Sequence, residues 1–155
     1  MQPNVYNFFK FLNQREQRPI PFKIKLLNAP ETITPQDLNV EGGLNLRNTP
    51  ITSLPEGLKV GGFLWLANTK ITSLPKGLTV GGYLNLGNTP ITSLPKGLKV
   101  GGFLSLRNTP ITSLPEDLKV GRWLDLANTP LSNKTDEEIK AMIGPNGYIK
   151  GEISR

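Results

Sequence analysis

The sequence predicts an α/β solenoid, which is a stack of short coils with one parallel strand per repeat and a helix near each end. Three observations lead to this prediction: a period of 20 residues, an alternation of leucines with other residues inside each repeat, and a helical pattern on either side of the repeats. Self-similarity at a fixed period of this length is the signature of a repeat architecture. The expected organisation is a single domain over residues 1–155, with an N-terminal helical cap (1–20), repeats (21–133) and a C-terminal helix–strand cap (134–155).

The N-terminal segment carries the apolar spacing of an amphipathic helix. Its apolar residues fall at positions i, i+3, i+4 and i+7, and they are Val5, Phe8, Phe9 and Leu12. This spacing places them on one face of a helix over residues 4–14. The pattern ends before Arg18 and Pro19, where a helix is expected to stop.

Four full repeats follow the consensus G-G-x-L-x-L-x-N-T-x-I-T-S-L-P-x-G-L-x-V. They are Glu41–Val60, Gly61–Val80, Gly81–Val100 and Gly101–Val120, with a degenerate repeat before them (Pro21–Val40) and a partial repeat after them (Gly121–Asn133). Within a repeat, Leu84 and Leu86 alternate with Tyr83 and Asn85, which predicts a short strand. The prolines and glycines that follow favour an extended or turn-like return.

One repeat by itself has too little apolar surface to offset the conformational entropy that its ordering removes. Stacked repeats bury each other's apolar faces and complete a ladder of strands, so a solenoid is expected. Equivalent residues of neighbouring repeats then lie about 4.8 Å apart. Gly81 and Gly82 are expected to form a tight corner where a Cβ would clash.

The C-terminal cap has well-marked helix signals. Thr135 is the expected N-cap, Glu138 completes a capping box, and Gly144 followed by Pro145 ends the helix. The stretch N-G-Y-I-K-G-E-I after the helix is expected to add a final strand. Both terminal segments are interpreted as lids that cover the apolar ends of the stack.

Composition excludes several classes of function. The chain has no Cys and no His, so disulfides, thiolate metal sites, cysteine nucleophiles and histidine bases are absent. No apolar run is long enough to cross a bilayer, and the first residues lack a secretory pattern, so a cytoplasmic location is expected. Delivery into a host cell by another route stays open. The net charge of +6 is typical of a solvated surface, and nucleic acid or an acidic protein surface is the sharper interpretation.

The repeats resemble the leucine-rich repeat, specifically the short 20-residue class with a Leu-Pro pair that is typical of bacteria and their phages. The matching residues in the first full repeat are Leu44, Leu46, Ile51, Leu54 and Pro55. The resemblance covers about residues 22–131, and the C-terminal stretch is similar to the ending of phage and bacterial proteins of this type. It implies a concave strand face that binds ligands. Some related secreted effectors carry a ubiquitin-ligase domain with a catalytic cysteine, which this chain lacks.

One departure from the family pattern leaves two questions open. The family places Asn three residues after the second strand leucine, whereas here that position holds Thr49 and its equivalents, with Asn one residue earlier. Either Asn or Thr therefore lines the interior of the turn. A parallel β-helix is the competing architecture, because the G-L-x-V-G-G segment is able to form a second sheet.

Residues that flank the strand leucines are expected to face outward, because successive side chains of a strand point to opposite faces. They form three columns across the repeats. The columns are Gly43, Phe63, Tyr83, Phe103 and Trp123; Asn45, Trp65, Asn85, Ser105 and Asp125; and Arg47, Ala67, Gly87, Arg107 and Ala127. Exposed aromatic rings in register are typical of an interaction site or of a ladder that stiffens the sheet.

The predicted partner-binding residues are the bulky or charged members of these columns. They are Phe63, Trp65, Tyr83, Phe103, Trp123, Arg47, Arg107 and Asp125. Trp65 departs from the Asn, Ser or Asp of its column, which favours a binding role. Tryptophan, tyrosine and arginine are the residues that most often dominate binding energy.

The sequence predicts a binding protein and no enzyme. No activated nucleophile, carboxylate pair, phosphate-binding loop or dinucleotide fingerprint is present, so no catalytic residue, metal or cofactor is expected. The leading hypothesis is a module that binds another protein on its concave sheet, by resemblance a host factor met by a bacterial or phage protein. Two alternatives stay open, which are nucleic-acid binding through exposed lysines and a homodimer through the aromatic face. The lysines are Lys59, Lys76, Lys96, Lys99 and Lys119.

Overall fold

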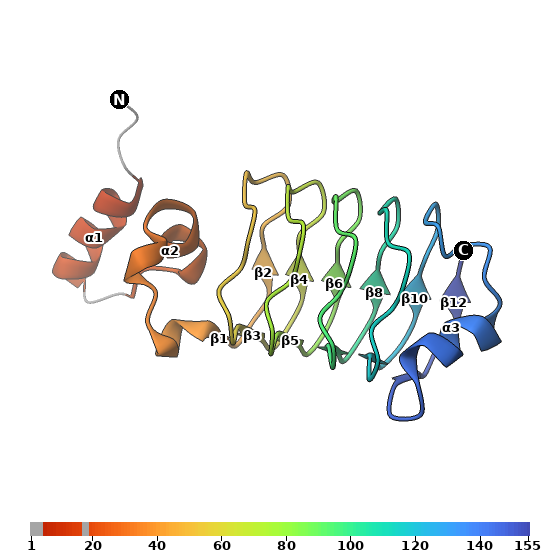
Figure 1. Cartoon of the computed structure of the whole chain (residues 1–155). Coiled ribbons are helices and arrows are strands. Elements are labelled where there is room, and N and C mark those ends of the chain that lie inside the picture. Colours follow the sequence, from red (N-terminus) through yellow and green to blue (C-terminus); the bar gives the residue numbers. More distant parts are fainter. Residues whose placement is uncertain (1–4, 17–18) are drawn as a thin grey trace. The chain divides into compact units, whose positions relative to one another are not determined.

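The computed structural model describes residues 5–16 and 19–155 (Figure 1). The chain divides into two compact units, one that ends at Leu38 and one from Asn39 to Arg155. The division lies inside Pro21–Val40, the segment expected to be a degenerate repeat.

The first unit is helical. It contains α1 (Val5–Glu16), α2 (Phe22–Asn28) and two short 3₁₀ turns, η1 (Pro30–Thr32) and η2 (Pro35–Leu38). The helix expected near the N-terminus is confirmed over α1, while the expected start at Asn4 and the boundary at Arg18 lie outside the described residues. Val5 and Phe8 of the predicted apolar face of α1 are exposed, and so is Phe11.

The expected strand of the degenerate repeat does not form, because Ile24 and Leu26 lie in α2. Two features of the full repeats are missing from this segment. It has no Gly-Gly corner, and Ala29 stands where the full repeats have a threonine. Lysine and leucine, which make up most of α2, have favourable helix propensities. Helix is therefore preferred where the turn chemistry of a coil is absent.

The second unit is a parallel solenoid with a strand period of 20 residues through the full repeats, which confirms the stacked architecture. One ladder contains the strand leucines, and we call it the leucine sheet. Its strands are β2 (Leu44–Asn45), β4 (Leu64–Trp65), β6 (Leu84–Asn85), β8 (Leu104–Ser105), β10 (Leu124–Asp125) and β12 (Ile153–Ser154). Equivalent residues pair in register, as Leu64 does with Leu84.

Each coil also forms a second short strand, in the segment where the β-helix alternative expects a second sheet. We call this ladder the valine sheet. Its strands are β1 (Asn39–Val40), β3 (Lys59–Val60), β5 (Thr79–Val80), β7 (Lys99–Val100), β9 (Lys119–Val120) and β11 (Tyr148–Ile149). The leucine-sheet strands lie side by side along the stack in Figure 1.

The core lies inside the coils. Leu84, Leu86 and Ile91 of the third full repeat are fully buried, and so are their equivalents in the neighbouring repeats. The predicted inward orientation of the paired leucines is therefore confirmed. The predicted tight corner is also confirmed, since a Cβ on Gly81 would overlap the backbone oxygen of Gly61 in the preceding coil.

The turn after each strand shows that threonine, not asparagine, lines the interior. Thr89 is buried, and its Oγ1 donates a hydrogen bond of 2.7 Å to the Leu86 carbonyl oxygen. Asn88 is exposed and adopts a left-handed backbone with φ of 56°. Its amide donates to Asn68 at 2.9 Å and accepts from Asn108 at 2.7 Å, so the asparagines form a ladder outside the stack.

This ladder gives a prediction at Asn88. Alanine at this position removes both amide bonds and must adopt the left-handed conformation, which costs roughly 1–2 kcal/mol for a residue with a Cβ. Glycine removes the same bonds without that steric cost. We therefore expect Asn88→Ala to lower the free energy of unfolding by about 1 kcal/mol more than Asn88→Gly does. Urea unfolding followed by circular dichroism measures the difference, and equal losses would contradict this account.

The predicted C-terminal helix forms, and two short strands follow it where one was expected. Helix α3 (Asp136–Ile143) begins after Thr135, whose hydroxyl accepts from the Glu138 amide at 3.2 Å, while the Glu138 carboxylate accepts from the Thr135 amide at 2.8 Å. Ile139 and Ile143 are buried, and β11 and β12 then extend both sheets. The helix lengthens this last coil, because Ile153 pairs with Leu124 across 29 residues instead of 20.

An ion pair in the first unit predicts a dependence on pH. Lys25 Nζ donates to both carboxylate oxygens of Asp37, at 3.0 and 2.8 Å, and the Thr34 amide donates to the same carboxylate at 2.7 Å. Burial by itself would raise the pKa of Asp37, but the bonds from Lys25 and Thr34 outweigh it and lower the pKa below its usual value. Because the folded pKa is depressed, this stabilisation is present above the unfolded pKa and is lost as the pH falls through the folded one.

We expect Asp37→Asn to destabilise the first unit by about 2 kcal/mol at pH 7, the contribution of hydrogen bonds to a charged group. Below about pH 4 the Asp37 carboxylate becomes protonated first in the unfolded chain, so the difference should shrink as the pH falls toward the lowered folded pKa. Amide hydrogen exchange in α2, compared between the two proteins at pH 7 and pH 3, measures it. A difference that stays constant with pH would refute the role given to the Asp37 charge.

Candidate binding surface

The outer face of the leucine sheet carries the columns that the sequence predicts. Because the strand leucines point inward, the residues between them point outward. Tyr83 and Trp123 are 43% and 55% exposed, while Phe63 and Phe103 are half-buried. The small residues of the third column (Ala67, Gly87 and Ala127) are buried, which leaves Arg47 and Arg107 as its exposed members.

The aromatic rings of this face contact one another. Phe63 stacks on Trp65 with ring centres 4.2 Å apart, and Tyr83 stacks on Phe103 at 4.4 Å. Trp123 meets Phe103 edge-on, at 5.0 Å and an interplanar angle of 85°. Such pairs contribute roughly 0.5–1.5 kcal/mol beyond the burial of their area, so the rings stiffen the sheet. The stacked rings cover part of each other, whereas Trp123 is the most exposed.

Trp65 is more enclosed than its place in the sequence pattern suggests. Its ring is half-buried, stacks on Phe63 and lies 4.4 Å from the guanidinium carbon of Arg47. A cation over an aromatic face is attracted by the ring quadrupole. Two of the predicted binding residues, Phe63 and Arg47, therefore contact a third, Trp65, at the N-terminal side of the face.

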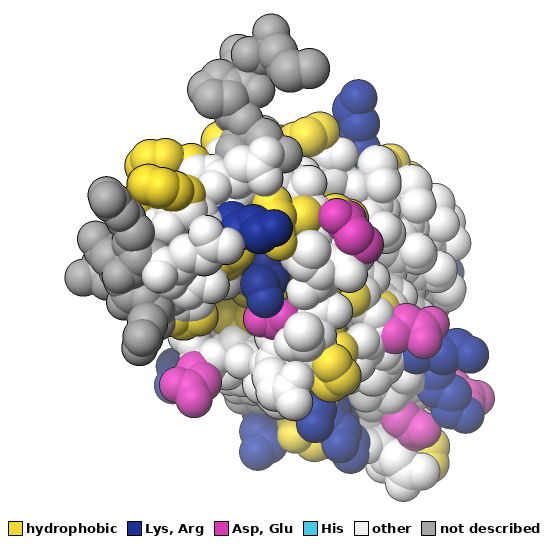
Figure 2. Space-filling model, turned by 90° about the vertical axis from the view of Figure 1, so that its left-hand side faces the viewer, with side chains coloured by type: hydrophobic (Ala, Val, Ile, Leu, Met, Phe, Trp, Pro, Cys, Tyr) yellow, Lys and Arg dark blue, Asp and Glu magenta, His cyan; other side chains and the backbone are white. Residues whose placement is uncertain are grey.

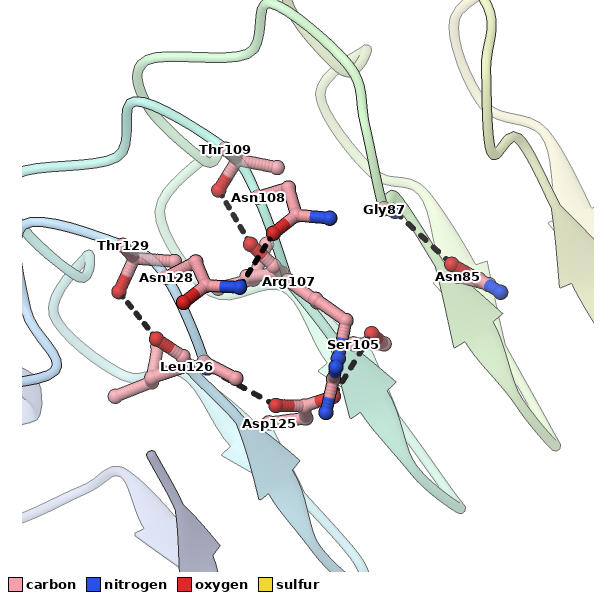
Figure 3. Close-up of polar contacts among 12 residues, drawn as sticks. Asn85, Gly87, Ser105, Arg107, Asn108, Thr109, Asp125, Leu126, Asn128 and Thr129 are labelled. Carbon is pink, nitrogen blue, oxygen red and sulfur yellow. Dashed lines mark hydrogen bonds and ion pairs between the residues drawn. The ribbon is translucent and has the colours of Figure 1, made fainter.

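At the C-terminal side, Asp125 is the centre of a polar cluster (Figure 3). Its Oδ1 accepts from the Ala127 amide at 3.0 Å, and its Oδ2 accepts from Arg107 Nε at 3.2 Å. The hydroxyl of Ser105 lies 3.5 Å from the same Oδ2, and both Ser105 and Arg107 point toward Asp125 in Figure 3. The Arg107 side chain is 55% exposed, so the ion pair contributes at most about 1 kcal/mol.

The second column, which holds Asn45, Trp65, Asn85, Ser105 and Asp125 and which we call the polar column, has a structural role as well. Asn85 Oδ1 accepts from the Gly87 amide at 2.9 Å, which is the bond that Asp125 makes to Ala127 in its own coil. Side chains of Asn and Asp often bond the backbone two residues ahead in this way. This bond occupies the side-chain oxygen of Asn85, so the side-chain nitrogen is available to donate hydrogen bonds.

A pocket of about 300 Å³ opens between these groups. It is lined by Tyr83, Asn85, Phe103, Leu104, Ser105, Trp123, Asp125 and Ser154. The structure thus brings together four of the predicted binding residues: Tyr83, Phe103, Trp123 and Asp125. Sequence reasoning did not select Asn85, Ser105 and Ser154. The first two stand in the polar column, and the third lies outside the 20-residue period.

The lysines do not make a surface of uniform charge. Lys96 pairs with Glu116, its equivalent in the next repeat, at 3.2 Å. Figure 2, which views the molecule from the end that carries the first unit, shows basic and acidic side chains interspersed on that face. In the repeats, Glu56 and Glu116 flank Lys76 and Lys96 in one column, so a continuous basic stripe, which phosphate-backbone binding favours, is interrupted.

Among residues 5–16 and 19–155, no helix has the length and apolar character needed to cross a membrane. Within the same ranges, no cluster of three or more acidic, histidine or cysteine residues has the geometry of a metal site. Comparison with protein-family models, with curated proteins and with solved structures finds no match.

Proposed function

We propose that this chain is a non-enzymatic module that binds a partner protein on the outer face of its leucine sheet. The observation that supports the proposal is the exposure of two large rings, Tyr83 at 43% and Trp123 at 55%, beside a pocket on the leucine sheet. Exposed aromatic side chains around a concave site are typical of interaction surfaces. Side chains that the scaffold already holds in place lose little conformational entropy when a partner binds.

The resemblance of the repeats extends this proposal. We infer that the solenoid is a leucine-rich repeat of the short Leu-Pro class, from a bacterium or phage, that acts in the cytoplasm on a host protein. The repeated Leu-Pro pair and the inward strand leucines support the inference. Asp125, the carboxylate on this face, is engaged by Arg107 and by the Ala127 amide, so we assign it no catalytic role.

A double variant tests the proposal. Tyr83→Ala with Trp123→Ala removes both exposed rings, and Tyr148→Ala removes an equally exposed ring from the valine sheet as the matched control. For a partner first isolated by pull-down and then purified, we expect the double variant to weaken binding about 30-fold or more, the effect of losing one strong hot spot. The control variant should bind as the wild type does. Equal affinities for all three proteins, with unchanged circular dichroism, would refute the proposal.

The same preparations distinguish the two alternatives. Binding to single-stranded nucleic acid that weakens steeply with salt, and that is lost on changing Lys59 and Lys99 to glutamate, would favour nucleic acid as the partner. A dimer in solution that dissociates in the double variant would favour self-association through the aromatic face.

A further inference from the structure

The pocket between Tyr83 and Trp123 combines an aromatic wall with a polar floor. Phe103 and the exposed ring of Trp123 supply apolar surface, and Asn85, Ser105, Asp125 and Ser154 supply polar atoms. Small-molecule sites commonly have this composition, in which apolar surface gives affinity and a few fixed polar groups give orientation.

The floor retains hydrogen-bonding capacity after its internal bonds are counted. A carboxylate accepts about four hydrogen bonds. Asp125 receives one good bond at each oxygen, together with a long contact from Ser105. Asn85 uses its oxygen on the Gly87 amide, which leaves its two amide hydrogens to donate. The pocket therefore presents both acceptors and donors beside an exposed indole ring.

Asp125 is the charged residue among those that line the pocket, and it is paired with an arginine. A second guanidinium, that of Arg122, lies 5.9 Å from the centre of the Phe103 ring. The Asp125 carboxylate faces the Arg107 guanidinium at 3.2 Å, so a cationic ligand would have to compete with an arginine that is already present. Insertion of a nucleobase between Tyr83 and Phe103 is excluded, because the two rings are stacked on each other with their centres 4.4 Å apart. A neutral ligand with an apolar face and several hydroxyl groups does not compete with Arg107 for the carboxylate. It also needs no gap between the stacked rings, because its apolar face can lie on Trp123.

We propose that this pocket binds a unit of a neutral saccharide, with the C–H face of the sugar on Trp123 and its hydroxyl groups on Asp125, Asn85 and Ser105. Sugar rings present axial C–H bonds on one face and hydroxyl groups around the rim, which matches an indole beside a polar floor. The proposal goes beyond the proposed function and shares with it only the face that is used. A protein partner and a saccharide are therefore separable outcomes.

A single-tryptophan protein tests the inference. The chain has two tryptophans, so Trp65→Phe leaves Trp123 as the reporter. The probes are neutral oligomers of glucose, mannose, galactose and N-acetylglucosamine, with an arginine-rich peptide and a single-stranded oligonucleotide as competing ligands. We expect one class of oligosaccharide to shift Trp123 emission and protect it from quenching, with a saturating Kd of about 1 mM or lower.

Two variants locate the site. Asp125→Asn keeps the bond to the Ala127 amide, as Asn85 shows for its own coil, and should lower saccharide affinity about tenfold. Tyr148→Ala should leave the affinity unchanged. The inference is overturned if no oligosaccharide saturates, if Asp125→Asn binds as tightly as the reporter protein, or if the peptide or the oligonucleotide occupies the pocket instead.

The result is independent of the pull-down experiment. Saturable saccharide binding without capture of a protein would support the saccharide site and refute the proposed protein partner. Capture of a protein that depends on Tyr83 and Trp123, with no saccharide bound, would support the protein partner and refute the saccharide site.

Discussion

Replacing Leu86 with alanine is expected to lower the free energy of unfolding of the solenoid by about 2–5 kcal/mol, the range for truncation of a buried leucine. Leu86 has no exposed surface and lies in a central coil, between the buried equivalents Leu66 and Leu106. The coils on either side are held by the strand ladder, so the cavity has little freedom to collapse. Thr92→Ala, at an exposed position of the same repeat, is the matched control and should change stability by less than about 0.5 kcal/mol.

Urea unfolding followed by circular dichroism measures both variants. Because each coil of a solenoid is stabilised by its neighbours, a defect in the middle also weakens coupling between the two halves. A lower slope of free energy against urea would report that loss of cooperativity. A Leu86→Ala protein as stable as Thr92→Ala would mean that the strand leucines do not form the core.

Gly81→Ala is the second substitution with a large expected effect, a loss of about 3 kcal/mol, at the upper end of overpacking. The added Cβ would overlap the Gly61 carbonyl oxygen, which is backbone and has no side-chain freedom with which to move away. The Gly81 amide also donates to Val60 at 2.7 Å, so the coil spacing at this corner is held by a short bond. Moving the coil outward to make room would lengthen that bond.

Gly42→Ala is the control for this prediction. A Cβ there has no atom within 4 Å, so the change should be neutral or slightly stabilising. Glu41 occupies the position equivalent to Gly81 in the first coil, directly after β1, which is the end strand of the valine sheet. The position that needs glycine between two coils therefore holds a larger residue at the end of the ladder. Thermal unfolding of the two alanine variants measures the difference. Equal midpoints would show that the corner does not require glycine.

Several features of the fold were determined by the sequence alone. The 20-residue period predicts the stack, the alternation at Leu84 and Leu86 predicts the inward leucines, and Thr135 with Glu138 predicts the start of the C-terminal helix. Each of these depends on local chemistry that repeats or on a short-range motif. The outward direction of Tyr83 and Trp123 follows from the same alternation.

Other features depended on contacts between coils, which the order of residues does not reveal. Asn88 and Thr89 have similar polarity. Only the stack shows that the Thr89 hydroxyl donates within its own buried turn, while the Asn88 amide donates to Asn68 in the preceding coil. The enclosure of Trp65 required the position of Arg47, one coil away. The segment Pro21–Val40 was wrongly interpreted as a repeat, because its scattered matches to the consensus, such as Ile24 and Leu26, carried no turn chemistry.

The candidate site divides in the same way. The 20-residue period predicted the aromatic and acidic residues of the site. It did not predict the pocket, because the pocket is also lined by Ser154, which comes from a coil lengthened by α3. Packing of the rings on one another left Tyr83 and Trp123 as the most exposed members of the aromatic column. A sequence assigns each side chain to a face, whereas the exposed fraction of that side chain is set by the volume of its neighbours in the coils on either side.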